Sequence, residues 1–163
     1  MRQLSLPIIA KINGYCLGGG LGLALNTDIR IACQNARFSI PAVKLGIVCP
    51  KDIIDQLIKL IGESHAKIIL YTGEQISAQQ AYTMGLVQYV CDNHDSLDKY
   101  VFDLAVRISQ NAPLSLCAIK FMIEKDTDDI MISTAIDACK NSNDIHEGRQ
   151  AFREKRSANF QGV

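Results

Sequence analysis

Two patterns of hydrophobic positions divide the chain into a mixed first part and a helical second part. Short apolar or alternating runs predict strands, and these lie at 7–13, 28–33 and 86–90. Apolar residues at helical spacing predict short helices at 20–26, at 52–62 with Gly62 as the stop, and at 64–71. Strands interleaved with helices indicate an α/β arrangement.

Two further local signals lie in the first part of the chain. The stretch RFSIPAVKLGIVCP is interrupted by Pro41, Gly46 and Pro50, which predicts a series of short extended pieces. Ser77 followed three residues later by Gln80 predicts a capping box and the start of another helix.

From Ser96 to the end, the apolar spacing is helical throughout. It predicts four helices, at 96–110, 113–124, 128–141 and 143–155. Pro113 suits the first turn of its helix, and Thr127 and Asn143 are candidate N-caps. We therefore expect a first region at 1–92 and a helical region at 93–163, the latter either packing on its own core or joining subunits.

Composition fits a folded domain and excludes several classes of partner. Hydrophobic residues make up 48% of the 163 positions, and 17 basic residues balance 17 acidic ones. A zero net charge does not predict a nucleic-acid partner or an anionic membrane. No apolar run reaches membrane-spanning length, and the N-terminal sequence does not resemble a signal peptide, so we expect a cytoplasmic protein.

The cysteines and histidines do not form a metal-binding pattern. The six cysteines are scattered without a Cys-x-x-Cys pair, and the three histidines are equally dispersed. We therefore expect reduced thiols that mostly pack as small apolar side chains, and no metal site.

The glycine-rich stretch CLGGGLGLALNTD allows several kinds of chemistry. Its spacing does not match the Gly-x-Gly-x-x-Gly pattern of a dinucleotide fold, and no nucleophile stands in a Gly-x-Ser-x-Gly frame. Backbone N–H groups at a helix start without obstructing side chains could form an oxyanion hole. Close packing of helix against strand at glycine is an equally open interpretation.

Three segments together resemble the enoyl-CoA hydratase/isomerase (crotonase) superfamily. They are PIIAKINGYCLGGGLGLALNTDIRIACQNARFSIPAVKLGI, LYTGEQISAQQAYTMGLVQYV and EGRQAFREKRSANF, in the family's order and spacing. The resemblance implies part of a spiral of β-β-α turns followed by a C-terminal helical trimerisation region. It also implies a homo-oligomer, a trimer or dimer of trimers. The expected substrate is an acyl-CoA thioester, with coenzyme A as part of the substrate and no separate cofactor.

The resemblance assigns roles to particular residues. Gly19 is expected to supply an oxyanion N–H to a thioester enolate, with Gly18 and Gly20 shaping the turn and Leu17 beside them in the substrate site. Two positions on the last helix match family contacts to coenzyme A of a neighbouring subunit. These are Phe152, by stacking or packing, and Lys155, by pairing with phosphate; a solvated basic face is the simpler alternative.

The chain departs from the family's hydratases at the positions that carry their acid and base. Gly22 and Ala42 stand where the two glutamates are expected, and Lys44 stands where the isomerase branch has an acid. Ala42 is then expected only to line the substrate site. Cys49 lies near the tyrosine position of a decarboxylase-like branch, where it could be a weak acid or nucleophile or simply an apolar filler.

The family's N-terminal portion, with its second oxyanion donor, is also expected to be missing. Three hypotheses remain. The first is an enzyme that relies on oxyanion stabilisation for isomerisation, decarboxylation or thioester hydrolysis, with glutamate-pair hydration improbable. The second is an inactive relative that still binds acyl-CoA, and the third is a structural protein without affinity for coenzyme A.

Overall fold

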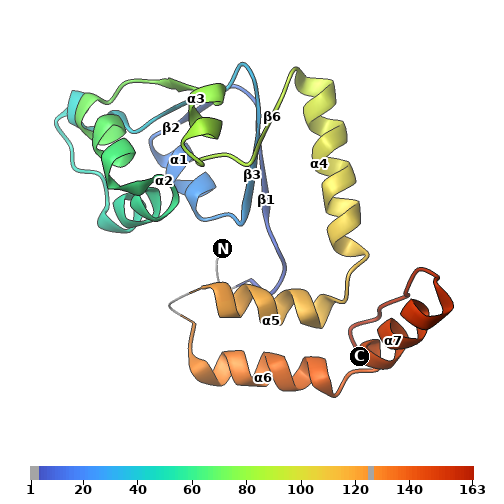
Figure 1. Cartoon of the computed structure of the whole chain (residues 1–163). Coiled ribbons are helices and arrows are strands. Elements are labelled where there is room, and N and C mark those ends of the chain that lie inside the picture. Colours follow the sequence, from blue (N-terminus) through green and yellow to red (C-terminus); the bar gives the residue numbers. More distant parts are fainter. Residues whose placement is uncertain (1–3, 125–126) are drawn as a thin grey trace. The chain divides into compact units, whose positions relative to one another are not determined.

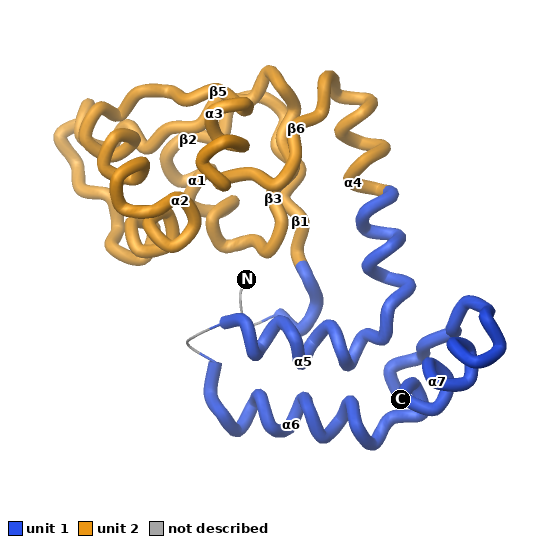
Figure 2. Tube along the Cα trace, in the orientation of Figure 1, with its two compact units in different colours: residues 1–7, 103–163 blue, residues 8–102 orange. Residues whose placement is uncertain are grey.

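The computed structural model describes residues 4–124 and 127–163. The chain forms two compact units, one of residues 8–102 and one of residues 1–7 with 103–163 (Figure 2). The boundary expected from the sequence, after residue 92, precedes helix α4 (His94–Ser109), whereas this division falls inside that helix.

The first unit contains two small sheets joined by helices (Figure 1). Parallel strands β1 (Ile9–Ile12), β3 (Ile29–Cys33) and β6 (Tyr89–Cys91) form one sheet, in the order β1-β3-β6. The other sheet has the order β2-β4-β5 and consists of β2 (Tyr15–Leu17), β4 (Arg37–Ser39) and β5 (Ile76–Ser77). Strands β2 and β4 are parallel, and β5 pairs antiparallel with β4.

The helices of this unit follow the strands closely. They are α1 (Gly19–Leu25), the 3₁₀ helix η1 (Pro41–Leu45), α2 (Lys51–Thr72), α3 (Ala78–Thr83) and the first part of α4. The capping box expected at Ser77 is confirmed, since Gln80 N–H donates to Ser77 Oγ and Ser77 N–H donates to Gln80 Oε1. The stop expected at Gly62 is a break in α2, where this glycine has φ 75° and ψ 162°.

The core of the first unit is apolar and continuous. Its fully buried side chains come from α1, β4, α2 and the turn before β6, and include Leu21, Phe38, Leu57, Ile69 and Leu86. One buried cation, Arg30, is satisfied by backbone: its Nε donates to Leu86 O at 2.7 Å and its Nη1 to Thr27 O at 2.6 Å. Burial lowers the pKa of Arg30, and Asp28 opposes that shift.

The second unit is helical. Helices α5 (Pro113–Ile123) and α6 (Asp129–Lys140) lie side by side, and α7 (Asp144–Glu154) follows (Figure 1). Among the described residues, the buried apolar side chains of this unit are few: Ala118, Phe121 and Ala151. No described helix in either unit combines the length and apolar character needed to cross a bilayer.

Several sequence predictions were wrong in detail. Of the extended pieces expected in RFSIPAVKLGIVCP, the first is confirmed as β4, whereas the stretch after it is a 3₁₀ helix, because Pro41 occupies the first turn of η1. The strand expected at 86–90 begins at Tyr89, although the residues before it are buried. The N-cap of α6 is Asp128 instead of Thr127, since the Asp128 carboxylate accepts from Ile130 N–H at 3.0 Å.

Candidate active site

The glycine turn joins β2 to α1 and leaves the first helical N–H groups available. Gly18 has φ 51° and ψ −117°, a conformation that side chains disfavour. Its N–H donates to Ser39 O at 2.8 Å, which ties the turn to the end of β4. No side chain caps the helix, and within the described residues the Gly19 N–H has no acceptor outside it. Gly19 therefore presents a donor where an anionic oxygen would be stabilised.

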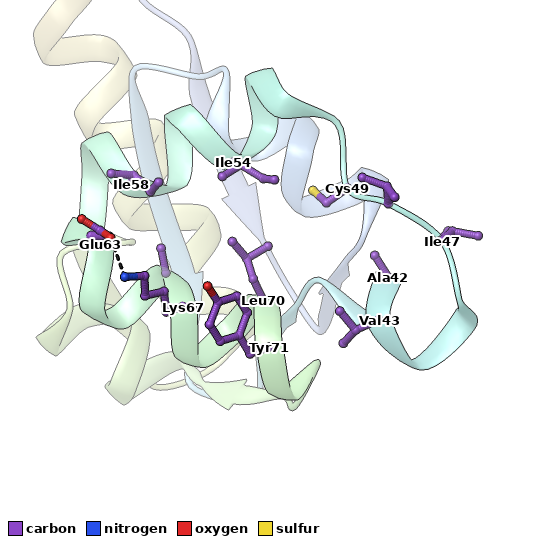
Figure 3. Close-up of a pocket in the computed structure, with 12 residues that line it drawn as sticks. Ala42, Val43, Ile47, Cys49, Ile54, Ile58, Glu63, Lys67, Leu70 and Tyr71 are labelled. Atoms are coloured by element: carbon purple, nitrogen blue, oxygen red, sulfur yellow. Dashed lines mark ion pairs between the residues drawn. The ribbon is translucent and has the colours of Figure 1, made fainter.

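An apolar cavity of about 400 Å³ lies between η1, the following loop and α2 (Figure 3). Its apolar lining consists of Ala42, Val43, Ile47, Val48, Cys49, Ile54, Ile58, Ala66 and Leu70. Polar groups also line it, namely Glu63, Lys67 and Tyr71. A lining of this kind suits a hydrocarbon chain with a polar group at one side.

The turn and the cavity are connected through two neighbouring segments. Ser39, which accepts from Gly18 N–H, is followed closely by η1, and η1 carries Ala42 into the cavity wall. On the other side, Gly22 of α1 faces Ile53, whose neighbour Ile54 also lines the cavity. The first turns of α1 therefore pack against α2, which forms one wall, and the glycine turn is bonded to the strand that precedes the other wall.

The space next to Gly22 is filled by an apolar side chain. A Cβ atom added at Gly22 would lie 2.6 Å from Cδ1 of Ile53, so any side chain at this position requires Ile53 to move. Gly22 itself is buried. The space that a side chain at this position would need is therefore occupied by the Cδ1 methyl group of Ile53.

Three ionisable groups of the cavity have shifted pKa values: Cys49, Glu63 and Lys67. Burial, with Asp52 nearby, raises the pKa of the Cys49 thiol, which disfavours the thiolate nucleophile. Glu63 forms an i,i+4 ion pair with Lys67, and this hydrogen bond lowers the pKa of Glu63 while raising that of Lys67. In Figure 3 this pair lies on the side of Ile58, away from Ala42. Cys49 is therefore held as a neutral thiol instead of a thiolate, and Glu63 is held as an ion-paired carboxylate instead of a neutral acid.

The structure brings together some of the residues expected from the sequence. The first unit contains Leu17, the glycine turn, Ala42 and Cys49. Lys44 belongs to the same unit, but it is exposed and does not line the cavity. Phe152 and Lys155 lie near each other at the end of α7 in the second unit. Both are exposed, Phe152 to 86%.

Sequence reasoning missed three contributors to the cavity region. Ile53 gave no signal, because its contact with Gly22 depends on how α2 packs against α1. Glu63 and Lys67 were detectable as a helical i,i+4 pair, but nothing in the sequence placed them at a cavity.

Comparison with known proteins identifies the family. The family model described as enoyl-CoA hydratase/isomerase matches residues 1–163. The 2,3-dehydroadipyl-CoA hydratase of Escherichia coli K12 is 34% identical over 99% of this chain and 66% of its own length. The crotonyl-CoA hydratase of Syntrophomonas wolfei is 38% identical over 98% of this chain and 64% of its own length.

A solved structure gives the same result for the fold. The crystal structure of enoyl-CoA hydratase from Bacillus anthracis superposes with a TM-score of 0.91 at 35% identity, covering 99% of this chain and 65% of that one. The chain thus spans about 65% of the length of the relatives that it matches. The α/β crotonase-like fold expected from the sequence is confirmed, and the chain belongs to the enoyl-CoA hydratase/isomerase family.

Proposed function

We propose that this protein binds acyl-CoA thioesters, with the thioester oxygen at the Gly19 N–H and the acyl group in the apolar cavity. The observation that carries the proposal is the difference between two N–H groups of the glycine turn. Gly18 N–H donates to Ser39 O, whereas Gly19 N–H remains available as a donor. An enolate oxygen formed from a thioester is the anion that such a donor stabilises best. Family membership supplies the substrate class.

The reaction that fits this site does not use a glutamate pair. Gly22 is packed against Ile53, and Ala42 contributes only a methyl group to the cavity. The proposed chemistry is therefore isomerisation, decarboxylation or thioester hydrolysis through oxyanion stabilisation. Coenzyme A enters as part of the substrate, and we propose no further cofactor. We also propose a homo-oligomer, a trimer or dimer of trimers, acting in the cytoplasm.

Two substitutions at one position test the oxyanion role. Gly19→Pro removes the N–H but suits the first position of a helix, and Gly19→Ala keeps the N–H in a place where an added Cβ meets nothing within 4 Å. The readout is calorimetric binding of acetoacetyl-CoA to the whole chain, together with turnover of any acyl-CoA found to react. We expect Gly19→Pro to lower turnover by about 10²–10³ and Gly19→Ala to lower it far less. Equal effects of the two variants would refute the assignment.

A second candidate is a relative that binds acyl-CoA without catalysis. The filled space at Gly22 and the raised pKa of Cys49 favour it, because the first leaves no room for a carboxylate at Gly22 and the second disfavours a thiolate base or nucleophile at Cys49. Assays of isomerisation, decarboxylation and thioester hydrolysis on acyl-CoA substrates separate the two. Binding without any turnover would select the inactive relative.

A further inference from the structure

The apolar cavity of the first unit has one charged pair in its lining, Glu63 with Lys67. Among the residues that the structure describes, every other member of this lining is uncharged, and Tyr71 carries the one hydroxyl. An apolar chain that fills the cavity therefore meets charged groups at one place only. What such a chain carries at that place decides whether the contact is favourable, because charge against apolar atoms loses its hydration.

A break at Gly62 positions the helix that carries this pair. Gly62 has φ 75° and ψ 162°, so α2 consists of two helical halves that meet at this residue. Ile54 and Ile58 line the cavity from the first half, and Leu70 and Tyr71 line it from the second. In Figure 3 the first two residues lie across the cavity from the other two. The break therefore lets one stretch of chain contribute to two sides of the same cavity.

Glu63, Lys67 and Tyr71 follow one another at i,i+4 spacing and form the polar edge of the second half of α2. Lys67 is the middle member. Its hydrogen bond to Glu63 raises the pKa of Lys67, and Tyr71 adds a smaller rise. The side chains of Lys67 and Glu63 are 52% and 66% exposed, so the pair stands at the rim of the cavity.

The pair lies at the end of the cavity that is farther from the glycine turn. Ala42 and Ile54 are the lining residues nearest in the chain to the contacts with that turn. Ile58 is one helical turn further along α2 than Ile54, and the ion pair lies on the side of Ile58, away from Ala42 (Figure 3). An acyl chain whose thioester lies at Gly19 therefore extends its free end toward the pair.

The chemistry of the pair matches a hydroxyl group. Lys67 has N–H donors besides the one that bonds to Glu63, and Glu63 has a second carboxylate oxygen. A hydroxyl both donates and accepts, so it can bond to both side chains while their ion pair stays intact. A methyl group would remove water from the pair without replacing its hydrogen bonds. A carboxylate would be repelled by Glu63, whose lowered pKa keeps it ionised at neutral pH.

We propose that the ion pair of Glu63 and Lys67 selects acyl-CoA thioesters that carry a hydroxyl on the last carbon of the acyl chain, with the hydroxyl donating to Glu63 and accepting from Lys67. The inference rests on the proposed function, which places the thioester at Gly19 and the acyl group in the cavity. It adds the class of acyl group, an ω-hydroxyacyl chain, that the cavity takes in preference to an unsubstituted one.

The test is calorimetric titration of the whole chain with three kinds of CoA thioester: unsubstituted, ω-hydroxy and ω-carboxy. Each kind is used with acyl chains of six, eight and ten carbons, so that ligands are compared at equal length. At the length that fits best, we expect the ω-hydroxyacyl-CoA to bind about fivefold tighter than the unsubstituted one. The ω-carboxyacyl-CoA should bind no tighter than the unsubstituted one. Absence of a hydroxyl preference at all three lengths, or a preference for the carboxylate, would overturn the inference.

Substitution of the ion pair shows whether it causes the preference. In the double variant Glu63→Ala with Lys67→Ala, the ω-hydroxy and unsubstituted ligands should bind equally. The matched control is Lys51→Ala with Asp55→Ala, an ion pair of the same spacing on α2 that lies outside the lining, and it should keep the preference. A preference that survives the first variant, or that the control also loses, contradicts the assignment.

The single variant Glu63→Gln gives an independent result and keeps the pair testable if the double variant does not fold, which thermal unfolding reports. It leaves Lys67 without its carboxylate partner. The ω-carboxyacyl-CoA should then bind several-fold tighter than it binds the wild-type chain, because repulsion is removed and the ammonium remains. An unchanged affinity would mean that the end of the acyl chain does not reach the pair.

The same titrations separate this inference from the proposed function. If unsubstituted acyl-CoA binds without a hydroxyl preference, the inference falls and the proposed function stands. If the preference depends on the ion pair but Gly19→Pro and Gly19→Ala have equal effects on turnover and affinity, the thioester placement at Gly19 falls and the ion-pair site stands. If no acyl-CoA binds, both fall.

Discussion

The two units of this chain differ in the interactions that stabilise each of them internally. In the unit of residues 8–102, a continuous apolar core runs from Ile12 to Val87, and a cavity lies beside it between η1 and α2. In the other unit, the buried apolar side chains among the described residues are only Ala118, Phe121 and Ala151, and the C-terminal segment is fixed by carboxylates. The stability of a packed core depends mainly on side-chain volume, whereas the stability of a segment held by charged hydrogen bonds depends on charge and pH.

Truncation of a matched pair of isoleucines should give the largest contrast. Ile69 in the first unit is 1% exposed and Ile130 on α6 is 71% exposed. We expect Ile69→Ala to cost about 2–5 kcal/mol of unfolding free energy, because it leaves a cavity in a close-packed core. Ile130→Ala should stay within about 0.5 kcal/mol. Urea unfolding followed by hydrogen exchange measures each unit separately, and a large loss at Ile130 would contradict the contrast.

Restoring a carboxylate at Gly22 should be the next largest perturbation. Gly22→Glu must displace Ile53 and bury a charge, so we expect a loss of about 1–3 kcal/mol and no hydration of crotonyl-CoA. Adding Ile53→Ala should recover part of the stability by making space. Hydratase activity from Gly22→Glu alone would show that the apolar filling does not exclude the family's acid-base chemistry.

The sequence predicted most helices and local caps well, but it did not predict which residues of different elements contact one another. Periodicity identified the helices after Ser96, and the capping box at Ser77 depended only on residues three apart. The Gly22–Ile53 contact could not be predicted, because it joins residues on two different helices. The family resemblance placed Gly19 in the turn, but only the structure separates its N–H from that of Gly18, which bonds to β4.

The ion pair between Arg156 and Glu147 was the least predictable feature of the second unit. Nothing in the sequence distinguishes Arg156 from Arg149 and Arg153, since all three are arginines near the end of the last helix. The distinction arises because the chain reverses at Lys155 and brings Arg156 back to Glu147. A left-handed lysine has no signature in the sequence, since the position normally calls for glycine.

A smaller effect is expected from the carboxylate nearest the start of α7. Asp144 is 5% exposed, and its two oxygens accept from Gln161 N–H at 2.8 Å and Gly162 N–H at 3.0 Å. Asp144→Ala should lower the free energy of opening the C-terminal segment by about 1–2 kcal/mol. Faster hydrogen exchange at those two amides measures it. Asp137→Ala, at an exposed carboxylate, is the control and should leave both exchange rates unchanged.

The smallest effect should come from titrating Glu147, whose side chain is partly exposed to solvent. Its pKa is about 2 in the folded chain, against an ordinary value of 4.5, because Arg156 and Asn159 N–H bond to the carboxylate. Because the pKa of Glu147 is lowered on folding, its ion pair with Arg156 contributes its full stabilisation above about pH 4.5. That stabilisation is lost as the pH falls through about 2. Glu154, the other acid on Arg156, also has a lowered pKa and titrates in the acidic range, whereas Arg156 stays charged.

The NMR shift of the Asn159 amide reports this titration directly, since that N–H donates to Glu147 Oε1. We expect its midpoint near pH 2 in the wild-type chain. Arg156→Met removes the first of the two causes, so the midpoint should move toward 4.5. A wild-type midpoint already near 4.5 would show that the ion pair is not held in solution, and the difference between the two units would then lie in the number of buried side chains alone.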